Sequence, residues 1–269
     1  MSRVEKAALA PFLPSLPWGV CPWTAVQHRL LPVRSAARLP QAPQSVLVVL
    51  FPYLLDRAYY AGTALAKYAV VRDYHLVCGD MLESTCQRLR AAYPAFSFVP
   101  FADASPVPEV PAAAAAGLGL VGKNGLLLHE KYGSWVFIGE IVTDLPVACA
   151  AAPVQGCHAC GRCLAACPTG ALSENGVEAA KCLSFLSQEK GALAPATQQL
   201  LRQNRVLWGC DRCQDACPLN QHACNTPIEA FYETACPVPP PDISDRAYAW
   251  RKAAFARNTS LLFPEESGR

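Results

Sequence analysis

Eight cysteines are gathered into two short motifs and the segment between them. The first motif, Cys157–Pro168, has the spacing C-x2-C-x2-C-x3-C-P, and the second, Cys210–Pro218, has the spacing C-x2-C-x3-C-P. The first spacing is that of bacterial ferredoxins, in which three thiolates bind one [4Fe–4S] cluster and the fourth binds the other. A zinc site needs only four ligands and gives no reason for the Cys-Pro ending. The spacing therefore predicts two iron–sulfur clusters that pass single electrons, with purely structural clusters as the alternative.

The crossing of the fourth ligand assigns the cysteines to their clusters. One cluster takes the first three cysteines of the first motif and the last cysteine of the second. The other cluster takes Cys167, Cys210 and Cys213 and is left one ligand short. Cys182, which lies between the motifs, is favoured over Cys224 for that position. The predicted ligands are Cys157, Cys160, Cys163, Cys217, Cys167, Cys182, Cys210 and Cys213.

The composition narrows the class of protein that surrounds these cysteines. The chain has 269 residues, of which 52% are hydrophobic and 14 are cysteine, and its net charge is +2. This argues against a disordered chain and against binding of nucleic acid by bulk electrostatics. The longest apolar run, 46–55, is about half of what a membrane-spanning helix needs. With no export signal at the N-terminus, we expect a cytoplasmic protein without a membrane partner, in which thiols stay reduced.

The hydrophobic pattern predicts an α+β fold. The residues before about Cys149 alternate between strand and helix patterns, with strands expected at 45–51, 96–101, 126–129 and 135–142. One long helix or two are expected over 63–93, and a short helix over 112–116. We expect a mixed α/β domain over 1–148, with a proline-rich N-terminal segment. A ferredoxin-like double-cluster domain over 149–236 follows. A linker and a short helix, expected over 244–257, occupy 237–269.

Several segments, taken in order along 45–225, resemble the epoxyqueuosine reductases. These are cobalamin-dependent, two-cluster enzymes of tRNA queuosine synthesis. The matching segments are Arg72–His75, Asp103–Val107, Ala116–Asn124, Gly133–Asp144, Cys157–Leu172, Lys181–Phe185 and Gly209–Asn220. Any one of these segments would be weak alone, but their order and spacing together are specific.

The resemblance implies a corrin-binding α/β domain whose cobalt is reduced by the adjacent clusters, and a proton donor at Asp103. Opening an epoxide and releasing its oxygen as water requires an acid at that oxygen. Asp103 follows an apolar strand, where burial would raise the pKa of its carboxyl group. A plain turn or helix-capping aspartate is the alternative.

The resemblance also implies cofactor contacts from Lys123 and Asn124, which lie in a glycine-flanked loop. Tyr74, His75 and Ser134 are further candidates for the corrin pocket, with no axial ligand role for His75. The alternatives are an ordinary glycine-rich turn, a structural histidine and simple packing.

The family's members continue after the clusters into a helical-repeat domain that helps to hold tRNA, whereas only a short segment follows Cys236 here. The main expectation is reduction of epoxyqueuosine to queuosine in tRNA, with electrons from an external donor such as a flavodoxin or ferredoxin. The first alternative is a cobalamin-dependent reductase of a small molecule. The second is an electron-transfer or corrinoid-handling protein without catalysis of its own.

Overall fold

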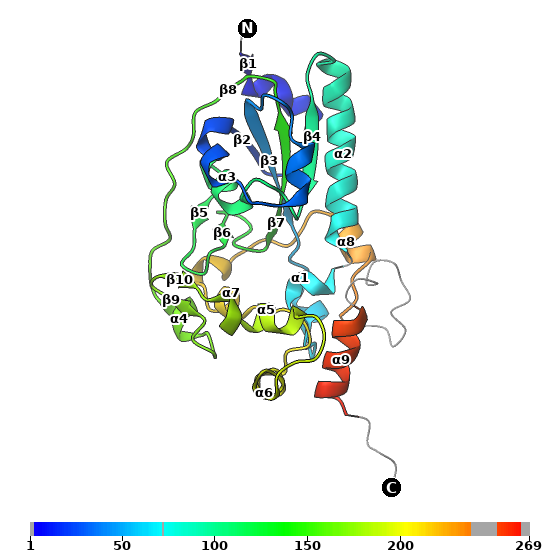
Figure 1. The fold of residues 1–269 in the computed structure, drawn as a ribbon, viewed down its shortest axis with the longest axis vertical. Helices are drawn as coiled ribbons and strands as arrows, with labels where there is room; N and C mark the ends of the chain where they lie inside the picture. Colours follow the sequence, from blue (N-terminus) through cyan, green and yellow to red (C-terminus); the bar gives the residue numbers. More distant parts are fainter. Residues whose placement is uncertain (1–2, 72, 238–251, 265–269) are drawn as a thin grey trace. The chain divides into compact units, whose positions relative to one another are not determined.

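The chain divides into two compact units in the computed structural model, which describes residues 3–71, 73–237 and 252–264 (Figure 1). Unit 1 comprises Met1–Pro52, Tyr74–Gly122 and Leu126–His158, and unit 2 comprises Tyr53–Asp73, Lys123–Gly125 and Ala159–Arg269. Two segments from the first half of the chain, 53–73 and 123–125, therefore group with the cysteine region. The expected boundary at residue 148 would place both segments in the first domain. The three expected domains stay a prediction.

The core of unit 1 is a four-stranded antiparallel sheet in the order β2–β3–β7–β4 (Figure 1). Its strands are β2 (Trp18–Pro22), β3 (Ser45–Pro52), β4 (Phe98–Ala102) and β7 (Val136–Thr143). All residues of β3 are buried, because this strand is central and both faces of the sheet are covered. The expected strand over 45–51 is confirmed, and β4 and β7 lie within two residues of their expected positions.

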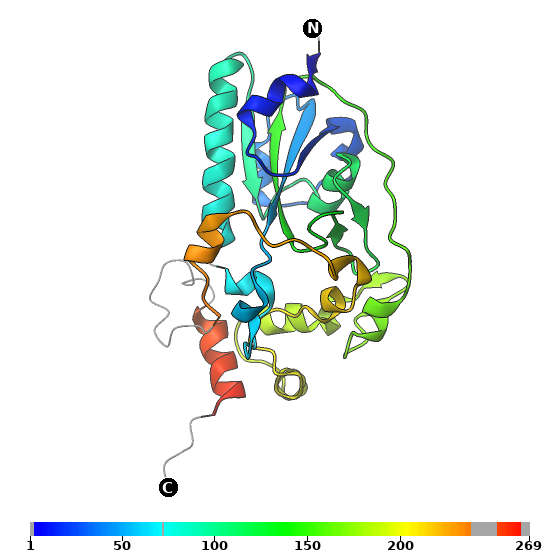
Figure 2. The same ribbon diagram turned by 180° about the vertical axis from the view of Figure 1, so that it is seen from behind.

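Two helices cover the faces of this sheet. On one side is α2 (Tyr74–Ala92), and on the other is α3 (Glu109–Ala115), as the views from the front and from behind both show (Figure 2). A Cβ atom at Gly139 would lie 2.7 Å from Leu82, so this position of β7 faces α2. Side chains alternate between the faces of a strand, which directs the next residue, Glu140, to the α3 face.

The remaining elements of unit 1 are short. β1 (Val4–Glu5) pairs in parallel with β8 (Val147–Ala148), and β5 (Leu120–Val121) pairs antiparallel with β6 (Leu127–Leu128). The expected helix over 112–116 begins three residues earlier, at Glu109. Pro111 lies in its first turn, where the missing N–H of a proline breaks no helical hydrogen bond.

Unit 2 consists mainly of short helices joined by turns. They are α1 (Lys67–Val70), α4 (Arg162–Ala165), α5 (Leu183–Gln188), α6 (Pro195–Asn204), α7 (Arg212–Asp215), α8 (Glu229–Glu233) and α9 (Lys252–Leu262). A small hairpin joins β9 (Leu172–Ser173) to β10 (Gly176–Val177). Of the two possibilities expected over 63–93, the two-helix one is confirmed, because the backbone is extended at Val71, between α1 and α2.

The C-terminal helix α9 is anchored within unit 2. The rings of Trp208 and Phe255 stack with their centroids 4.9 Å apart, and the Asn258 amide donates to the carbonyls of Ser187 at 2.9 Å and Leu207 at 2.7 Å. The first part of the helix expected over 244–257 lies outside the described residues, and α9 continues beyond it to Leu262. Within the described ranges, no helix is both long and apolar enough to cross a membrane.

Candidate functional site

Asp103 lies in a strained turn directly after strand β4. Asp103 and Ala104 both have left-handed backbone conformations, with φ angles of 61° and 47°. Such a conformation costs a non-glycine residue about 1–2 kcal/mol, although aspartate tolerates it better than most. Three hydrogen bonds hold the turn: Ser35 Oγ to the Ala104 carbonyl, Ser105 Oγ to the Glu140 carboxylate, and the Asp103 N–H to the Glu109 carboxylate. Strain that is held by several contacts is typical of a functional site.

The Asp103 side chain pairs with His75, the second residue of α2. His75 Nε2 lies 2.9 Å from Asp103 Oδ2, and the two side chains are 30% and 58% exposed. The expected apolar burial of Asp103 is therefore not found, because more than half of its side chain is accessible. The pairing still gives the carboxyl group a fixed orientation at the surface of unit 1.

Two further carboxyl groups, Glu109 and Glu140, lie behind this turn, and the sequence analysis did not single them out. Burial raises the pKa of Glu109 to about 7, the charge of Asp103 adds to the rise, and the Asp103 N–H and His75 oppose it. Burial raises the pKa of Glu140 to about 8, opposed by the Ser105 hydrogen bond and reinforced by the charge of Glu109. A carboxylate in the middle of the apolar segment Val136–Thr143 was the one signal of this cluster in the sequence.

Tyr74 and Ser134 border a cavity of about 140 Å³ that Glu109 also lines. The Tyr74 ring stacks on Phe137, with centroids 4.0 Å apart and the planes 9° apart, and also on His75 at 4.1 Å. The lining residues are Tyr74, Glu109, Val110, Leu126, Leu127, Ser134, Val136, Phe137 and Ile138. Unit 1 thus brings together four of the predicted cofactor or catalytic residues: Tyr74, His75, Asp103 and Ser134.

The other two predicted cofactor residues belong to unit 2. Lys123 forms an ion pair with Glu174. Asn124 is buried, and its side chain forms a hydrogen bond with the Cys213 thiol. The structure therefore shows this pair in contact with the cysteine region.

The two cysteine motifs have the same local structure. Each contains a one-turn helix, α4 in the first and α7 in the second, and these helices pack against each other. In each motif the N–H of the last cysteine donates to the carbonyl three residues earlier, at 3.2 Å from Cys167 to Leu164 and at 3.1 Å from Cys217 to Gln214. The relation between the motifs is thus present in the backbone as well as in the spacing.

The Cys167 thiol is surrounded by hydrogen-bond donors. Burial disfavours its thiolate, but hydrogen bonds from the Thr169 hydroxyl and from the N–H groups of Thr169, Ala171 and Leu172 outweigh burial and lower the pKa. The hydroxyl lies 3.6 Å from the sulfur. Donors directed at a ligand sulfur stabilise the thiolate that a cluster requires.

Cys182 lies at the start of α5, near the second motif. Burial is the main cause of the raised pKa of Cys210 and of the rise in the pKa of Cys213 to about 12. The charge of Cys182 raises both pKa values further. The three thiols are therefore close enough to interact. Cys224 is exposed. This arrangement favours Cys182 over Cys224 as the remaining ligand, although the choice stays a prediction.

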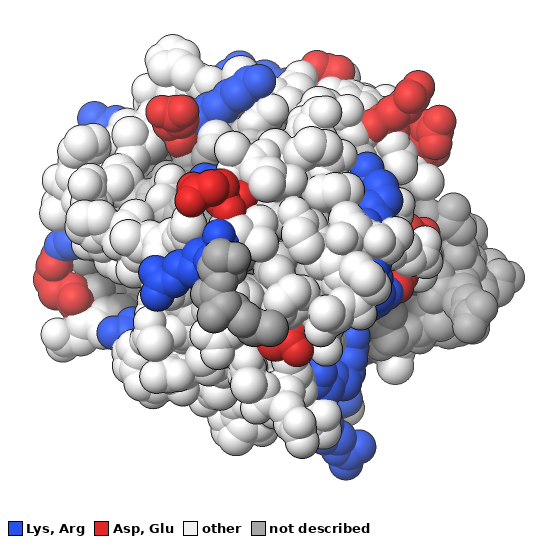
Figure 3. All heavy atoms as spheres, turned by 90° about the horizontal axis from the view of Figure 1, so that it is seen from above, with Lys and Arg blue, Asp and Glu red and all other residues white. Residues whose placement is uncertain are grey.

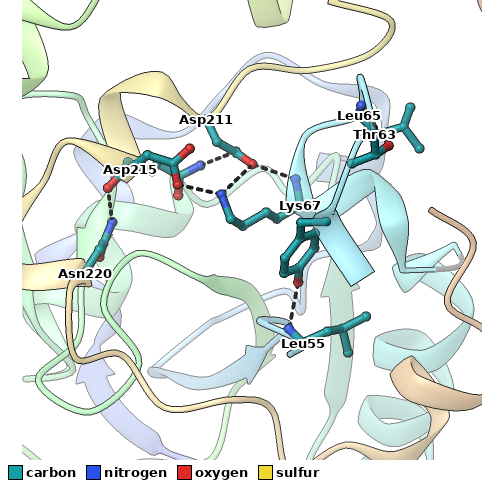
Figure 4. A network of polar contacts seen from close by, with 9 residues as sticks. Leu55, Thr63, Leu65, Lys67, Asp211, Asp215 and Asn220 are labelled. Carbon is teal, nitrogen blue, oxygen red and sulfur yellow. Dashed lines mark hydrogen bonds and ion pairs between the residues drawn. The ribbon is translucent and has the colours of Figure 1, made fainter. Parts of the chain in front are cut away.

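A polar network holds the second motif in place (Figure 4). Asp211, the residue after Cys210, accepts the Lys67 N–H at 2.6 Å, and Lys67 Nζ lies 2.5 Å from Asp215 and 3.7 Å from Asp211. Burial raises the pKa of Asp211 to about 6, and Lys67 is the main opposing influence. The network ties α7 to α1, which the sequence alone did not indicate.

The donor set is one of free thiols in two motifs whose one-turn helices pack together, and thiolates are the ligands that hold iron–sulfur clusters. Among the described residues, no three His, Cys, Asp or Glu side chains converge closely enough to hold one metal ion. A [4Fe–4S] cluster binds each thiolate through a different iron atom, so its ligands stand further apart. On the face shown in Figure 3, Lys and Arg side chains are scattered among uncharged residues and form no broad basic surface.

Comparisons with known proteins match the two regions of the chain in which most of these residues lie. Residues 156–220 match a family described as a 4Fe-4S double cluster binding domain, and residues 34–104 match one described as "Epoxyqueuosine reductase QueG, DUF1730". The chain thus contains an iron–sulfur cluster-binding domain.

A curated relative, "Epoxyqueuosine reductase" of Aliivibrio fischeri, is 32% identical over 262 residues, which are 94% of this chain and 69% of the relative. A crystal structure of a selenomethionine-labelled epoxyqueuosine reductase is 24% identical, with a TM-score of 0.77, and covers 96% of this chain and 80% of that one. A second structure, of an epoxyqueuosine reductase with a tRNA-Tyr epoxyqueuosine-modified stem loop, is 23% identical with a TM-score of 0.75 over 95% of this chain and 79% of that one. These structures confirm the mixed α/β fold.

Proposed function

The chain belongs to the epoxyqueuosine reductase family, and we propose on this premise that it reduces epoxyqueuosine to queuosine in tRNA. A solved relative in the presence of an epoxyqueuosine-modified tRNA stem loop supports tRNA as the substrate here too. The observation that carries the proposal in this chain is Asp103, which pairs with His75 in a strained turn held by three hydrogen bonds.

Asp103 is the proposed proton donor. Its carboxylic acid group protonates the epoxide oxygen while two electrons reach the substrate, the C–O bonds break, and the oxygen leaves as water. His75 orients the carboxyl group, since its Nε2 lies 2.9 Å from Oδ2. The exposed position of Asp103 suits a substrate as large as an anticodon nucleotide, which must approach from outside.

Two [4Fe–4S] clusters would be held by the ligand sets predicted from the spacing. One set is Cys157, Cys160, Cys163 and Cys217, and the other is Cys167, Cys182, Cys210 and Cys213. The clusters supply single electrons, which an external flavodoxin or ferredoxin would deliver. The packing of α4 against α7 supports the close association of the two motifs.

Cobalamin is the cofactor that the family implies for the α/β unit. When bound, it supplies a strongly reducing cobalt centre. The cavity of about 140 Å³ is smaller than the ~300–1,000 Å³ that encloses a drug-sized ligand, so it cannot contain a whole corrin. Its aromatic, hydroxyl and carboxyl lining fits one amide-bearing side group of such a ring. Tyr74, His75 and Ser134 would hold that edge, and contacts from Lys123 and Asn124 stay a prediction.

The test is anaerobic reconstitution of the full chain with iron, sulfide and cobalamin, followed by incubation with epoxyqueuosine-containing tRNA and a reduced flavodoxin. Mass spectrometry of the digested tRNA should show queuosine formed over many turnovers. A protein that carries iron, sulfide and cobalamin but forms no queuosine would refute the proposal. Turnover of a small epoxide without turnover of tRNA would favour the small-molecule alternative.

A further inference from the structure

One stretch of the chain is basic and contains no acidic residue, and the proposed reaction gives it no role. Residues 6–55 carry four of the 23 Lys and Arg residues and none of the 21 Asp and Glu residues. Because the whole chain has a net charge of only +2, the other residues together are net negative. Three of these four cations lie within 28–38, where a histidine accompanies them. Residues 28–38 are called the basic strip below.

Two hydrogen bonds tie the basic strip to the turn that holds Asp103. The Ser35 hydroxyl donates to the Ala104 carbonyl, and the Leu31 N–H donates to the Pro106 carbonyl at 2.8 Å. The residue before Ser35 is an arginine, and the residue before Ala104 is Asp103 itself. A molecule that presents a reacting group to Asp103 therefore lies beside the basic strip.

The arginines of the strip comprise one anchor and two exposed cations. Arg38 donates to the Pro100 carbonyl at 2.9 Å, and its guanidinium group lies 4.8 Å from the centre of the Phe101 ring, so this side chain holds the strip against β4. Arg29 and Arg34 are exposed, and neither forms an ion pair within the part of the chain that the structure describes. Both are thus available to an external anion, and the planar guanidinium group matches the geometry of a phosphate.

The backbone between the two exposed cations is short and stiff. One 3₁₀ turn, Gln27–Arg29, precedes it and another, Arg34–Arg38, follows it, with Pro32 between them. Proline fixes the backbone, so the strip loses little conformational freedom when it binds a ligand. Leu30 and Leu31 are 37% and 45% exposed between the two cations. A single-stranded RNA loop presents both phosphates and unstacked bases, which suits a surface of alternating charge and apolar groups.

We propose that the basic strip binds backbone phosphates of the tRNA anticodon loop through Arg29 and Arg34, next to the nucleotide that is reduced at Asp103. The proposal rests on the proposed function and names the surface of this chain that holds the substrate. It needs a short local strip only, which is compatible with the low net charge of the chain. An acidic electron donor is a less suitable occupant, because the cysteine motifs that receive its electrons belong mainly to unit 2 and the strip belongs to unit 1.

The test is the binding of a fluorescein-labelled anticodon stem loop that contains epoxyqueuosine, measured by anisotropy on the reconstituted full chain at several salt concentrations. Arg29→Gln/Arg34→Gln should raise Kd by roughly 10-fold, since one exposed ionic contact contributes up to about fivefold. Each phosphate contact to a single strand adds about 0.7 to the slope of log K against log salt, so the slope should become shallower by about 1.4. In turnover of tRNA, KM should rise by more than kcat falls.

Two further variants show whether the charge and its position matter. Arg29→Lys/Arg34→Lys keeps both charges and should keep most of the affinity and of the salt dependence. Arg88→Gln removes another exposed cation of unit 1, about 20 Å along α2 from His75, and should bind the stem loop as the wild type does. Iron and acid-labile sulfide contents should be equal in all variants, because the substituted side chains are exposed.

The outcomes separate the two proposals. If the wild type forms queuosine but Arg29→Gln/Arg34→Gln keeps the wild-type Kd and salt dependence, the tRNA contact of the strip is wrong and the proposed function stands. If that variant binds the stem loop normally but is reduced more slowly by flavodoxin, the strip binds the electron donor instead. If the wild type binds the stem loop through the strip but forms no queuosine with iron, sulfide and cobalamin in place, the proposed function is wrong while the phosphate-binding surface remains.

Discussion

The acid cluster of unit 1 and the cysteine region of unit 2 are built in opposite ways. Asp103, Glu109 and Glu140 come from a turn, a helix and a strand, and a buried four-stranded sheet fixes their positions. The cysteines come from two short motifs with one-turn helices, and most of their side chains are only half-buried. Unit 1 positions its groups by packing, whereas the proposed clusters would themselves position those of unit 2.

This difference predicts where each region is sensitive. Metal–thiolate bonds contribute directly to folding where the surrounding core is small, so the loss of one ligand should disturb a whole cluster. In unit 1, the sheet persists when one carboxyl group changes, so a substitution should alter chemistry and leave the fold intact.

The largest effect should come from Cys182→Ala. This variant should lose one cluster, about four of about eight irons per chain, and with it the ability to pass electrons, because the electron path is interrupted. Iron and acid-labile sulfide content after anaerobic reconstitution measures the effect. Cys224→Ala is the matched control and should keep both clusters. The reverse result, with iron lost from Cys224→Ala only, would show that the ligand was assigned to the wrong cysteine.

Asp103→Asn should be next in size and should affect turnover only. Asparagine has nearly the same shape but no acidic proton, and positioned general acids contribute about 10²–10⁴-fold to rate. We expect that loss in kcat, with unchanged iron and cobalamin content and an unchanged rate of cobalt reduction. Asp80→Asn, on the exposed side of α2, serves as the control. Loss of cobalamin from Asp103→Asn would instead identify a binding residue, and full turnover would identify a turn former.

The two regions also differed in how far the sequence revealed them. Most of the predicted cluster ligands lie two or three residues from the next cysteine, so their spacing alone indicated them, whereas Cys182 was chosen over Cys224. The central strand β3 was equally plain, because a short, unbroken apolar run rich in β-branched residues is typical of a buried strand. The choice between one helix and two over 63–93 stayed open, since nothing in the pattern of apolar residues marks the extended backbone at Val71.

Glu109 and Glu140 show why the acid cluster was missed in part. Asp103 was singled out through the resemblance to the family, but its interaction with Glu109 depends on how α3 packs on the sheet, and Glu140 comes from β7. Only the register, which pairs Val48 with Glu140, places that carboxyl group on the α3 face. Contacts of this kind join residues that are far apart in the chain and leave no local pattern.

Glu140→Gln should change the pH dependence of stability. The pKa of Glu140 rises from 4.5 to about 8 on folding. The neutral carboxyl group therefore makes its full contribution to the free energy of unfolding below pH 4.5, and this contribution is lost as the pH rises through 8. The wild type should therefore lose about 2–4 kcal/mol between pH 5 and pH 9, and Glu140→Gln, which cannot ionise, should lose less by that amount. Denaturant unfolding at several pH values measures this, with Glu130→Gln as the control. Parallel curves for Glu140→Gln and the wild type would mean that Glu140 is ionised in the folded protein.

The smallest effect should come from Lys67→Met, which tests how much the ion pairs of Lys67 contribute to the stability of unit 2. Lys67 is the cation beside Asp211, whose side chain is only 6% exposed, and its removal leaves that carboxylate without its ion pair. We expect a loss of about 1–3 kcal/mol at pH 8, since a contact to a buried charged group contributes about that much, although Asp211 keeps the backbone N–H of residue 67 and the Gln214 amide as donors. The loss should shrink at pH 5.5, because the pKa of Asp211 is already raised to about 6 and rises further without Lys67, so that the neutral acid forms.

Lys181→Met is the control: its pair with Glu178 is exposed, and its loss should cost no more than about 0.5 kcal/mol at either pH. The measurement is the guanidinium concentration at the midpoint of unfolding, for the reconstituted wild type and both variants at the two pH values. Equal losses for Lys67→Met and Lys181→Met would show that the clusters alone, without this network, hold the second motif in place.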